Sequence, residues 1–232
     1  MSDLCVIVPT RSRPANIARL IQGWEDTGAT AHLLIVLDED DPTLEDYDEV
    51  LRESRGHEYG FLGVIVAPRK RLGPTLNHEA IAQAQRWAYV GFMGDDHLPR
   101  TAGWDDRITD NLADLRTGIV YGNDLFQGPN LPTAVFMTSD IIRALGYMCP
   151  PEQIHLYLDN AWKTWGESIG RLRYLDGVVI EHLHPEAAGK AEWDPQYVEV
   201  NGGAMYENDG AAWDRYRENT LPGDLLKLRE LL

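Results

Sequence analysis

The stretch "YVGFMGDDHLPR" (residues 89–100) joins an apolar run to a polar cluster. Residues 89–93 are apolar and are followed by glycine, a pattern that predicts a buried strand. Two aspartates and a histidine (95–97) then lie where this strand leaves the sheet. Adjacent carboxylates repel each other, so the pair is costly unless a positive group, often a hard cation, lies beside them. A solvated turn with an aspartate capping a helix near residue 101 is the alternative, and this stretch alone leaves both open.

The segments before this stretch alternate between strand-like and helix-like patterns. Four apolar runs predict buried strands, at residues 4–9, 32–37, 62–68 and 89–93. Helical spacing or strong helix formers lie between them, at residues 14–24, 43–55 and 74–88. This order predicts the parallel, right-handed half of an α/β fold of nucleotide-binding type.

The second half of the chain is less regular. Further strands are predicted at residues 118–123, 133–139 and 175–185, and helices at residues 140–146 and 159–170. From residue 186 onward the chain is polar and aromatic, and it ends in a predicted amphipathic helix, 224–232. This tail either folds over a site as a lid or pads the sheet.

The composition argues against some classes of binding partner and indicates where the protein resides. A net charge of −16 over 232 residues argues against a dominant electrostatic grip on duplex DNA or on an anionic membrane. The two cysteines, Cys5 and Cys149, have no metal-type spacing and are expected to be reduced. The N-terminus lacks the basic region of a signal peptide, and no apolar stretch approaches a membrane span. We therefore expect a cytoplasmic protein.

The loops after the four predicted strands carry alternating charge. Basic loops, "PTRSRP" and "PRKRLG", follow the first and third strands, and acidic loops, "DEDDP" and "GDDHLP", follow the second and fourth. Ligands of parallel α/β sheets bind where such loops meet, outside the carboxyl ends of the strands. The basic side chains predict an anion site there: Arg11, Arg13, Arg69, Lys70 and Arg71. Carboxylates opposite them suit a divalent cation or sugar hydroxyls, so a phosphate-bearing ligand bridged by metal fits both signs.

Several common motifs are missing from the sequence. No G-x-G-x-x-G follows the first strand and no G-x-x-x-x-G-K-[ST] occurs, which argues against dinucleotide cofactors and P-loop chemistry. The sequence also lacks the G-x-S-x-G elbow of many hydrolases. A phosphate must therefore be held by side chains and metal rather than by a glycine loop.

An ordered set of segments resembles the GT-A-type nucleotide-sugar glycosyltransferases, in particular those of the family-two kind. The segments are "CVIVPTRSRP", "LLIVLDEDDP", "RLGPTLNHEA", "YVGFMGDDHLP", "YLDNAWKTWGESIG" and "VVIEHLHP". The resemblance implies a GT-A-like, Rossmann-type, mostly parallel sheet flanked by helices, with a smaller mixed half on the acceptor side. We predict one catalytic domain over residues 1–185, divided into a nucleotide-binding half (1–100) and an acceptor-side half (101–185), followed by the tail 186–232.

The resemblance also implies roles for single residues. It assigns the nucleotide-sugar donor to Pro9, Thr10, Arg11, Arg13, Asp38, Arg71 and Asn77. Asp38 is expected at the base or ribose, and Arg71 and Asn77 near the ribose or diphosphate. The family's D-x-D motif falls on "GDDH", with Asp96 in the metal-binding place. His182 or His184 would complete a site for Mn²⁺ or Mg²⁺, whereas His97 is expected beside the ligands rather than among them.

Two positions depart from the family pattern. Gly94 stands where the first aspartate of D-x-D is usual, so that contact is absent or supplied by Asp95. The acidic dipeptide that usually carries the catalytic base is here Leu158-Asp159. Asp159 is the predicted general base if the reaction inverts configuration, and a helix cap is its alternative role.

The sequence therefore predicts a glycosyltransferase that moves a sugar from a nucleoside-diphosphate sugar to an acceptor hydroxyl with the help of a divalent cation. The acceptor, which is a glycan, a protein or a modified nucleobase, stays open. A nucleotidyltransferase is one alternative, although it usually has a loop rich in glycine and lysine after the first strand. A catalytically silent nucleotide- or sugar-binding module is another.

Overall fold

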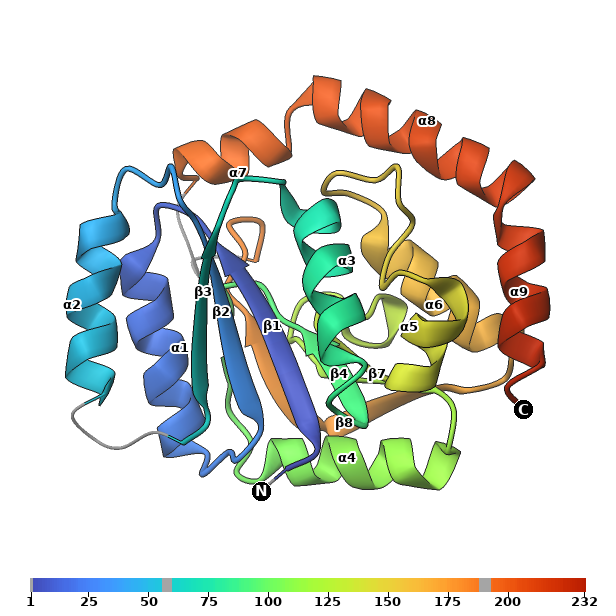
Figure 1. The fold of residues 1–232 in the computed structure, drawn as a ribbon, viewed down its shortest axis with the longest axis horizontal. Coiled ribbons are helices and arrows are strands. Elements are labelled where there is room, and N and C mark those ends of the chain that lie inside the picture. The colour runs from blue at the N-terminus through green and yellow to red at the C-terminus, as the bar shows by residue number, and fades with distance from the viewer. Residues whose placement is uncertain (1, 56–59, 188–192) are drawn as a thin grey trace.

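The computed structural model describes residues 2–55, 60–187 and 193–232 of an α/β protein. Its first part confirms the predicted alternation of strands and helices (Figure 1). The elements are β1 (Leu4–Thr10), α1 (Pro14–Asp26), β2 (His32–Asp38), α2 (Leu44–Arg55), β3 (Leu62–Ala67), α3 (Leu72–Gln83) and β4 (Tyr89–Phe92).

The second part mixes strand directions. It contains β5 (His97–Pro99), α4 (Trp104–Leu115), β6 (Ile119–Asn123), the short 3-10 helix η1 (Gly128–Asn130), β7 (Val135–Thr138), α5 (Ser139–Leu145), α6 (Leu158–Ser168) and β8 (Leu172–His182). Three helices follow: α7 (Pro195–Val200), α8 (Gly203–Asn219) and α9 (Leu221–Arg229). None of the helices in the described part of the chain has the length and apolar composition needed to span a bilayer.

The eight strands form one sheet in the order β3-β2-β1-β4-β7-β6-β8-β5. Strands β1 to β4 run parallel, and β6 and β8 share their direction because β7 is antiparallel to both β4 and β6. The carboxyl ends of six strands therefore lie at one edge of the sheet. The loops that the sequence marks as charged begin at this edge.

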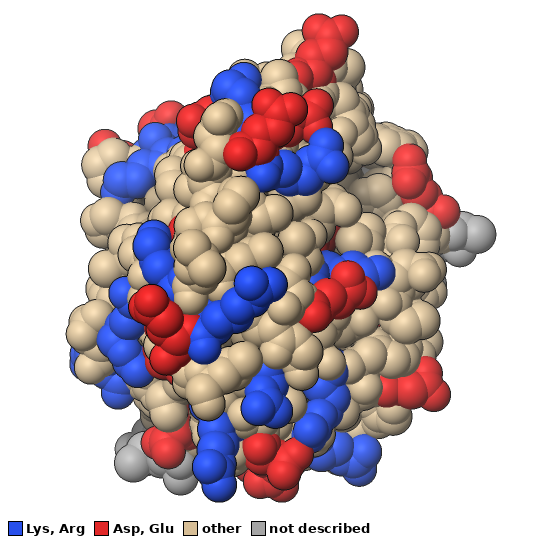
Figure 2. Space-filling model, turned by 90° about the vertical axis from the view of Figure 1, so that its right-hand side faces the viewer, with Lys and Arg blue, Asp and Glu red and all other residues tan. Residues whose placement is uncertain are grey.

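Alternate residues of the strands enter two cores on opposite faces of the sheet. On β1, Leu4, Val6 and Val8 pack against the face covered by α1, α2 and α4, whereas Cys5 and Ile7 face α3, α5 and α6 (Figure 1). This is the period of two that a strand buried on both faces requires. On the face that carries the C-terminal helices, acidic and basic side chains are interspersed (Figure 2).

The structure differs from the sequence prediction at two places. The three residues of β5 pair antiparallel with β8, His97 opposite His182, where no strand is predicted, because so short a strand has no periodicity to detect. The 17-residue helix α8 lies in the polar and aromatic tail, where the only predicted helix is 224–232. Its buried residues are few (Asp209, Ala212 and Tyr216), so it lacks the apolar stripe that marks an amphipathic helix.

Candidate active site

A cavity of about 420 Å³ lies at the carboxyl edge of the sheet. It is lined by the loops after β1 to β4, by the segment 126–133, by residues 154–162 and by α7 with the start of α8. The predicted site residues that line it are Pro9, Thr10, Arg11, Arg13, Asp38, Arg71, Asp95, Asp96, Asp159, His182 and His184. The fold thus brings together side chains from both halves of the chain.

One side of the cavity carries the guanidinium groups of Arg11, Arg13, Arg69 and Arg71. Arg11 donates to Asp38 at 3.0 Å, and the Nε of Arg69 lies 3.6 Å from the same carboxylate. Arg71 has a φ of 72°, a left-handed conformation that costs a non-glycine residue about 1–3 kcal/mol and clusters at functional sites. This side of the cavity is suited to an anion despite the acidic composition of the chain.

Asp95 joins two of the loops. Its carboxylate accepts from the hydroxyl of Thr10 at 2.6 Å and from Arg13 at 3.0 Å. Burial and the neighbouring Asp96 raise the pKa of Asp95, and Arg13 opposes this shift. Asp95 therefore holds Arg13 in place at the cavity wall. In this structure its carboxylate is used by Thr10 and Arg13, whereas the sequence predicts that it contacts the donor.

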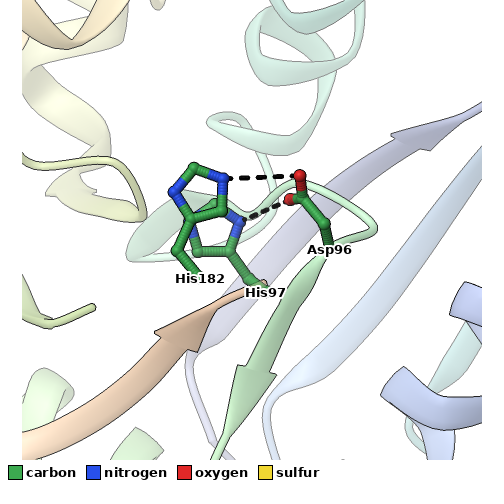
Figure 3. A group of neighbouring side chains, drawn as sticks. All are labelled: Asp96, His97 and His182. Atoms are coloured by element: carbon green, nitrogen blue, oxygen red, sulfur yellow. Dashed lines mark ion pairs between the residues drawn. The ribbon is translucent and has the colours of Figure 1, made fainter. Parts of the chain in front are cut away.

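Asp96, His97 and His182 form a compact group on the other side of the cavity (Figure 3). His97 Nδ1 and His182 Nε2 lie 3.2 and 3.3 Å from the two oxygens of Asp96, and the imidazole rings stack at 4.2 Å. The stacking follows from the pairing of β5 with β8, which sets His97 opposite His182. Burial alone would raise the pKa of Asp96, but the two histidines outweigh it and hold the pKa well below its usual value.

The chemistry of this group fits a divalent cation. One atom from each residue can be chosen so that all three lie within 4.8 Å of one another. His182 Nδ1 and His97 Nε2 are buried without a hydrogen-bond partner, which leaves polar atoms unused in a closed site. A carboxylate with imidazoles suits Mn²⁺ better than Mg²⁺, which prefers oxygen ligands.

His184 lies after the end of β8 and outside this group. Its ring stacks on Phe126 at 5.5 Å, and its Nδ1 accepts from the backbone N–H of Glu186. Of the two predicted alternatives, His182 is therefore the better placed beside Asp96. His97, expected only beside the ligands, lies as close to Asp96 as His182 does.

Gly94 is required by the tight turn before Asp96. A Cβ at this position would lie 2.4 Å from Asp96 Oδ1, and the Gly94 N–H donates to His97 Nδ1 at 3.0 Å. The first aspartate of a D-x-D motif does not fit this geometry unless Asp96 moves. Asp96 also does not cap α4, whose N-cap residue is Gly103, so the helix-cap alternative is wrong.

Asp159 lies in the first turn of α6 and lines the cavity. Its carboxylate accepts from the N–H of Asn160 at 2.9 Å, and burial raises its pKa. Tyr157, the residue just before α6, has a φ of 64°, which turns the chain sharply into the helix. A raised pKa moves a carboxyl group toward the range in which a general base works at neutral pH.

Asn77 does not line the cavity. Its side-chain oxygen accepts from the N–H groups of Met148 and Cys149, and its amide donates to the Cys149 carbonyl, each at 2.9 Å. Because its hydrogen-bonding groups are used on the backbone, Asn77 ties α3 to the loop after α5. The expected contact of this residue with the ribose or diphosphate finds no support in its position.

Four polar residues near the cavity were not singled out from the sequence. Asp124 accepts from the N–H groups of residues 126–128 at 2.7–3.0 Å and lies 3.9 Å from His182 Nδ1, so it shapes the loop beside the candidate metal group. The other three are Asp194, Tyr197 and Glu199, which α7 and its first flanking residue bring over the arginines and Asp96. Only their position after the tail has folded reveals them.

No protein-family model matches the chain, and no curated protein matches it in sequence. Solved structures do match it. A mannosyltransferase from Pyrobaculum calidifontis, in complex with GDP-Man and Mn²⁺, has a TM-score of 0.57 at 14% identity, covering 99% of this chain and 74% of that one. Glucosyl-3-phosphoglycerate synthase from Mycobacterium tuberculosis, with Mn²⁺, UDP and glucosyl-3-phosphoglycerate, has a TM-score of 0.54 at 13% identity, covering 91% and 78%.

The chain has the GT-A fold. This confirms the predicted fold class and the resemblance. The same architecture occurs in a Bacillus anthracis protein described as a glucose-1-phosphate thymidylyltransferase, with a TM-score of 0.52 at 10% identity, covering 84% of this chain and 98% of that one. At such identities the likeness concerns the GT-A fold, and the reaction has to be argued from the site.

Proposed function

We propose that this protein is a metal-dependent glycosyltransferase that moves a sugar from a nucleoside-diphosphate sugar to an acceptor hydroxyl. The observation that carries the proposal is a single cavity lined by four arginines, by Asp96 with His182, and by Asp159. An anion site, a cation site and a base with a raised pKa are the three functions that this reaction needs.

The arginines bind and orient the donor. Guanidinium groups recognise phosphate oxygens through charge-assisted hydrogen bonds, so Arg13, Arg69 and Arg71 are assigned to the diphosphate. Asp38, at the end of β2, is assigned to the base or ribose. Removing it as Asp38→Ala should weaken nucleotide binding by about 1–3 kcal/mol, the size of a lost charge-assisted hydrogen bond.

Asp96 and His182, together with His97 of the same compact group, are the residues that would hold the cation. A bound divalent cation supplies Lewis-acid stabilisation of the departing diphosphate. Asp159 takes the proton from the acceptor hydroxyl if the reaction inverts configuration, and the burial that raises its pKa makes it a stronger base than an exposed carboxylate. The missing side chain at Gly94 leaves room for Asp96 Oδ1, the oxygen that faces His97.

A panel of nucleoside-diphosphate sugars, incubated with and without MnCl₂, tests the proposal. Thermal shift identifies the donor, because a ligand of the native state raises the melting temperature by mass action. Release of the nucleoside diphosphate then measures slow hydrolysis or transfer. We expect both signals to need Mn²⁺ and to be lost in Asp96→Ala.

One further pair of substrates, added to the same panel, separates the alternatives. The GT-A fold is shared with a protein described as a thymidylyltransferase, and such an enzyme would join a sugar phosphate to a nucleoside triphosphate with release of pyrophosphate. Pyrophosphate formation from that pair of substrates would replace the present proposal. Tight binding of a donor with no turnover on any acceptor and no hydrolysis would favour a binding module.

A further inference from the structure

Helix α7 and the residues on either side of it, 193–201, cross the mouth of the cavity above the ends of β1, β2 and β3 (Figure 1). We call this segment the α7 strap. Asp194 accepts from Arg13 Nε at 2.7 Å and from Arg13 Nη2 at 2.9 Å. Glu199 pairs with Arg71 and, at 3.4 Å, with Arg69. Two carboxylates of the strap thus lie on three arginines assigned to the donor.

The strap also contacts the candidate metal group. The Tyr197 hydroxyl donates to Asp96 Oδ2 at 2.6 Å, which is the oxygen that faces His182. The Tyr197 ring lies under the Arg13 guanidinium at 4.1 Å. A cation bound between Asp96 and His182 would compete with this hydroxyl for the same oxygen.

The chemistry of these contacts matches that of the proposed ligand. A carboxylate that accepts two parallel N–H bonds from a guanidinium occupies the same donors that a phosphate would use. With the strap in place, a diphosphate entering the cavity would meet Asp194 and Glu199 as well as the arginines, and like charges repel.

We infer that the α7 strap is a built-in competitor for the donor's diphosphate and cation, so that Asp194, Tyr197 and Glu199 set how tightly the site binds phosphate-bearing ligands. The inference rests on the proposed function, because it takes the arginines and Asp96 as the donor site. A ligand that reaches these groups must displace the strap. A nucleoside, which carries no phosphate, gains nothing from displacing it.

The α7 strap is held by fewer buried contacts than α8, so it can be displaced while α8 stays in place. The helix has six residues, too few to be stable alone, and only Tyr197 and Val200 of it are buried. Gly202 and Gly203 follow it, and a Cβ at Gly203 would meet no atom within 4 Å. By contrast, Asp209 of α8 accepts from the N–H groups of residues 154–156 at 2.7–3.3 Å and anchors that helix.

The competition has a simple thermodynamic form. The apparent dissociation constant of a ligand that needs the open site is its intrinsic value divided by the open fraction. Weakening the strap therefore tightens the binding of every ligand that uses the arginines by one common factor. Ligands that do not reach the arginines keep their affinity.

Isothermal titration calorimetry of inorganic pyrophosphate and of UDP and GDP, with MnCl₂ present, tests this inference. Glu199→Gln removes the charge of a partly exposed pair and should tighten pyrophosphate roughly two- to fivefold. Asp194→Asn should tighten it at least as much, because the amide oxygen still caps α7 while the negative charge that pairs with Arg13 is lost. Glu152→Gln is the matched control, since Glu152 pairs with Arg215 at 2.8 Å and does not line the cavity.

Trp193 gives a second readout. Its side chain is 51% exposed and its ring centroid lies 6.2 Å from that of Tyr197, so pyrophosphate should change its fluorescence in the wild type. Unchanged or weaker pyrophosphate binding in both strap variants would overturn the inference. If UDP or GDP binds but neither variant binds it more tightly, the inference fails and the proposed function stands. If pyrophosphate tightens in the variants but no nucleoside diphosphate binds, the strap is supported and the proposed function fails.

Discussion

The two sides of the cavity are assembled in different ways. The arginine side is built from loops that follow the parallel strands β1 and β3, and parallel strands deliver their loops to one edge without further instruction. The histidine side depends on the pairing of β5 with β8, which sets His97 opposite His182. Charges on the first side can be predicted from their order in the chain, whereas the second side needs a strand pair that the sequence does not mark.

The largest expected effect concerns Asp159, the proposed general base. Asn is nearly isosteric and leaves donor binding and stability almost unchanged, but it cannot take a proton. Transfer to the acceptor should therefore fall roughly 10²–10⁴-fold in Asp159→Asn. Rates of transfer, measured with calorimetric donor affinity, check this. Transfer at the wild-type rate would reduce Asp159 to a residue of the first helical turn.

A matched pair of variants tests which histidine on this side of the cavity binds the metal. His182→Ala should weaken Mn²⁺ binding at least roughly 10- to 100-fold, because that range applies when a hydrogen-bond partner of a metal ligand is lost and His182 is assigned as a ligand itself. His184→Ala should change it little, because His184 stacks on Phe126 outside the compact group. Calorimetry or electron paramagnetic resonance of added Mn²⁺ measures both. Equal losses would mean that the site includes both histidines.

A substitution of Asn77 distinguishes a role in stability from the predicted role in donor binding. Because its side chain makes three hydrogen bonds to residues 148 and 149, Asn77→Ala should lower the free energy of unfolding by about 1–3 kcal/mol. Nucleotide affinity of the folded protein should stay unchanged. Urea unfolding and calorimetry below the transition check the two halves of this prediction. A large loss of affinity at unchanged stability would restore Asn77 to the donor site.

The last prediction concerns the pH dependence of stability and His155, which lies in the segment 154–162 that lines the cavity. Burial lowers the pKa of His155 to about 4, so the folded protein keeps this ring neutral. The unfolded chain binds the proton near pH 6.5, so stability is complete above that value and is lost as pH falls toward 4. The loss should be about 2 kcal/mol between pH 7 and pH 4.5, relative to His155→Gln. Parallel pH dependences in urea unfolding of the two proteins would contradict this assignment.

Much of the fold and part of the site follow from the sequence. The apolar runs 4–9, 32–37 and 89–93 predict parallel strands, and their order predicts that the charged loops meet. Asp96 and Asp159 are found from short motifs, and both line the cavity. These features are local, because each depends on periodicity or on the residue that directly follows a strand.

Tertiary structure alone decided the rest. It joined Asn77 to the backbone after α5, set His97 beside Asp96, and folded Asp194, Tyr197 and Glu199 over the cavity. These contacts join segments that lie far apart in the chain, and a surface acid in the tail has the same local sequence pattern whether it faces solvent or an arginine. Packing and electrostatic pairing in the folded molecule are what distinguish the two.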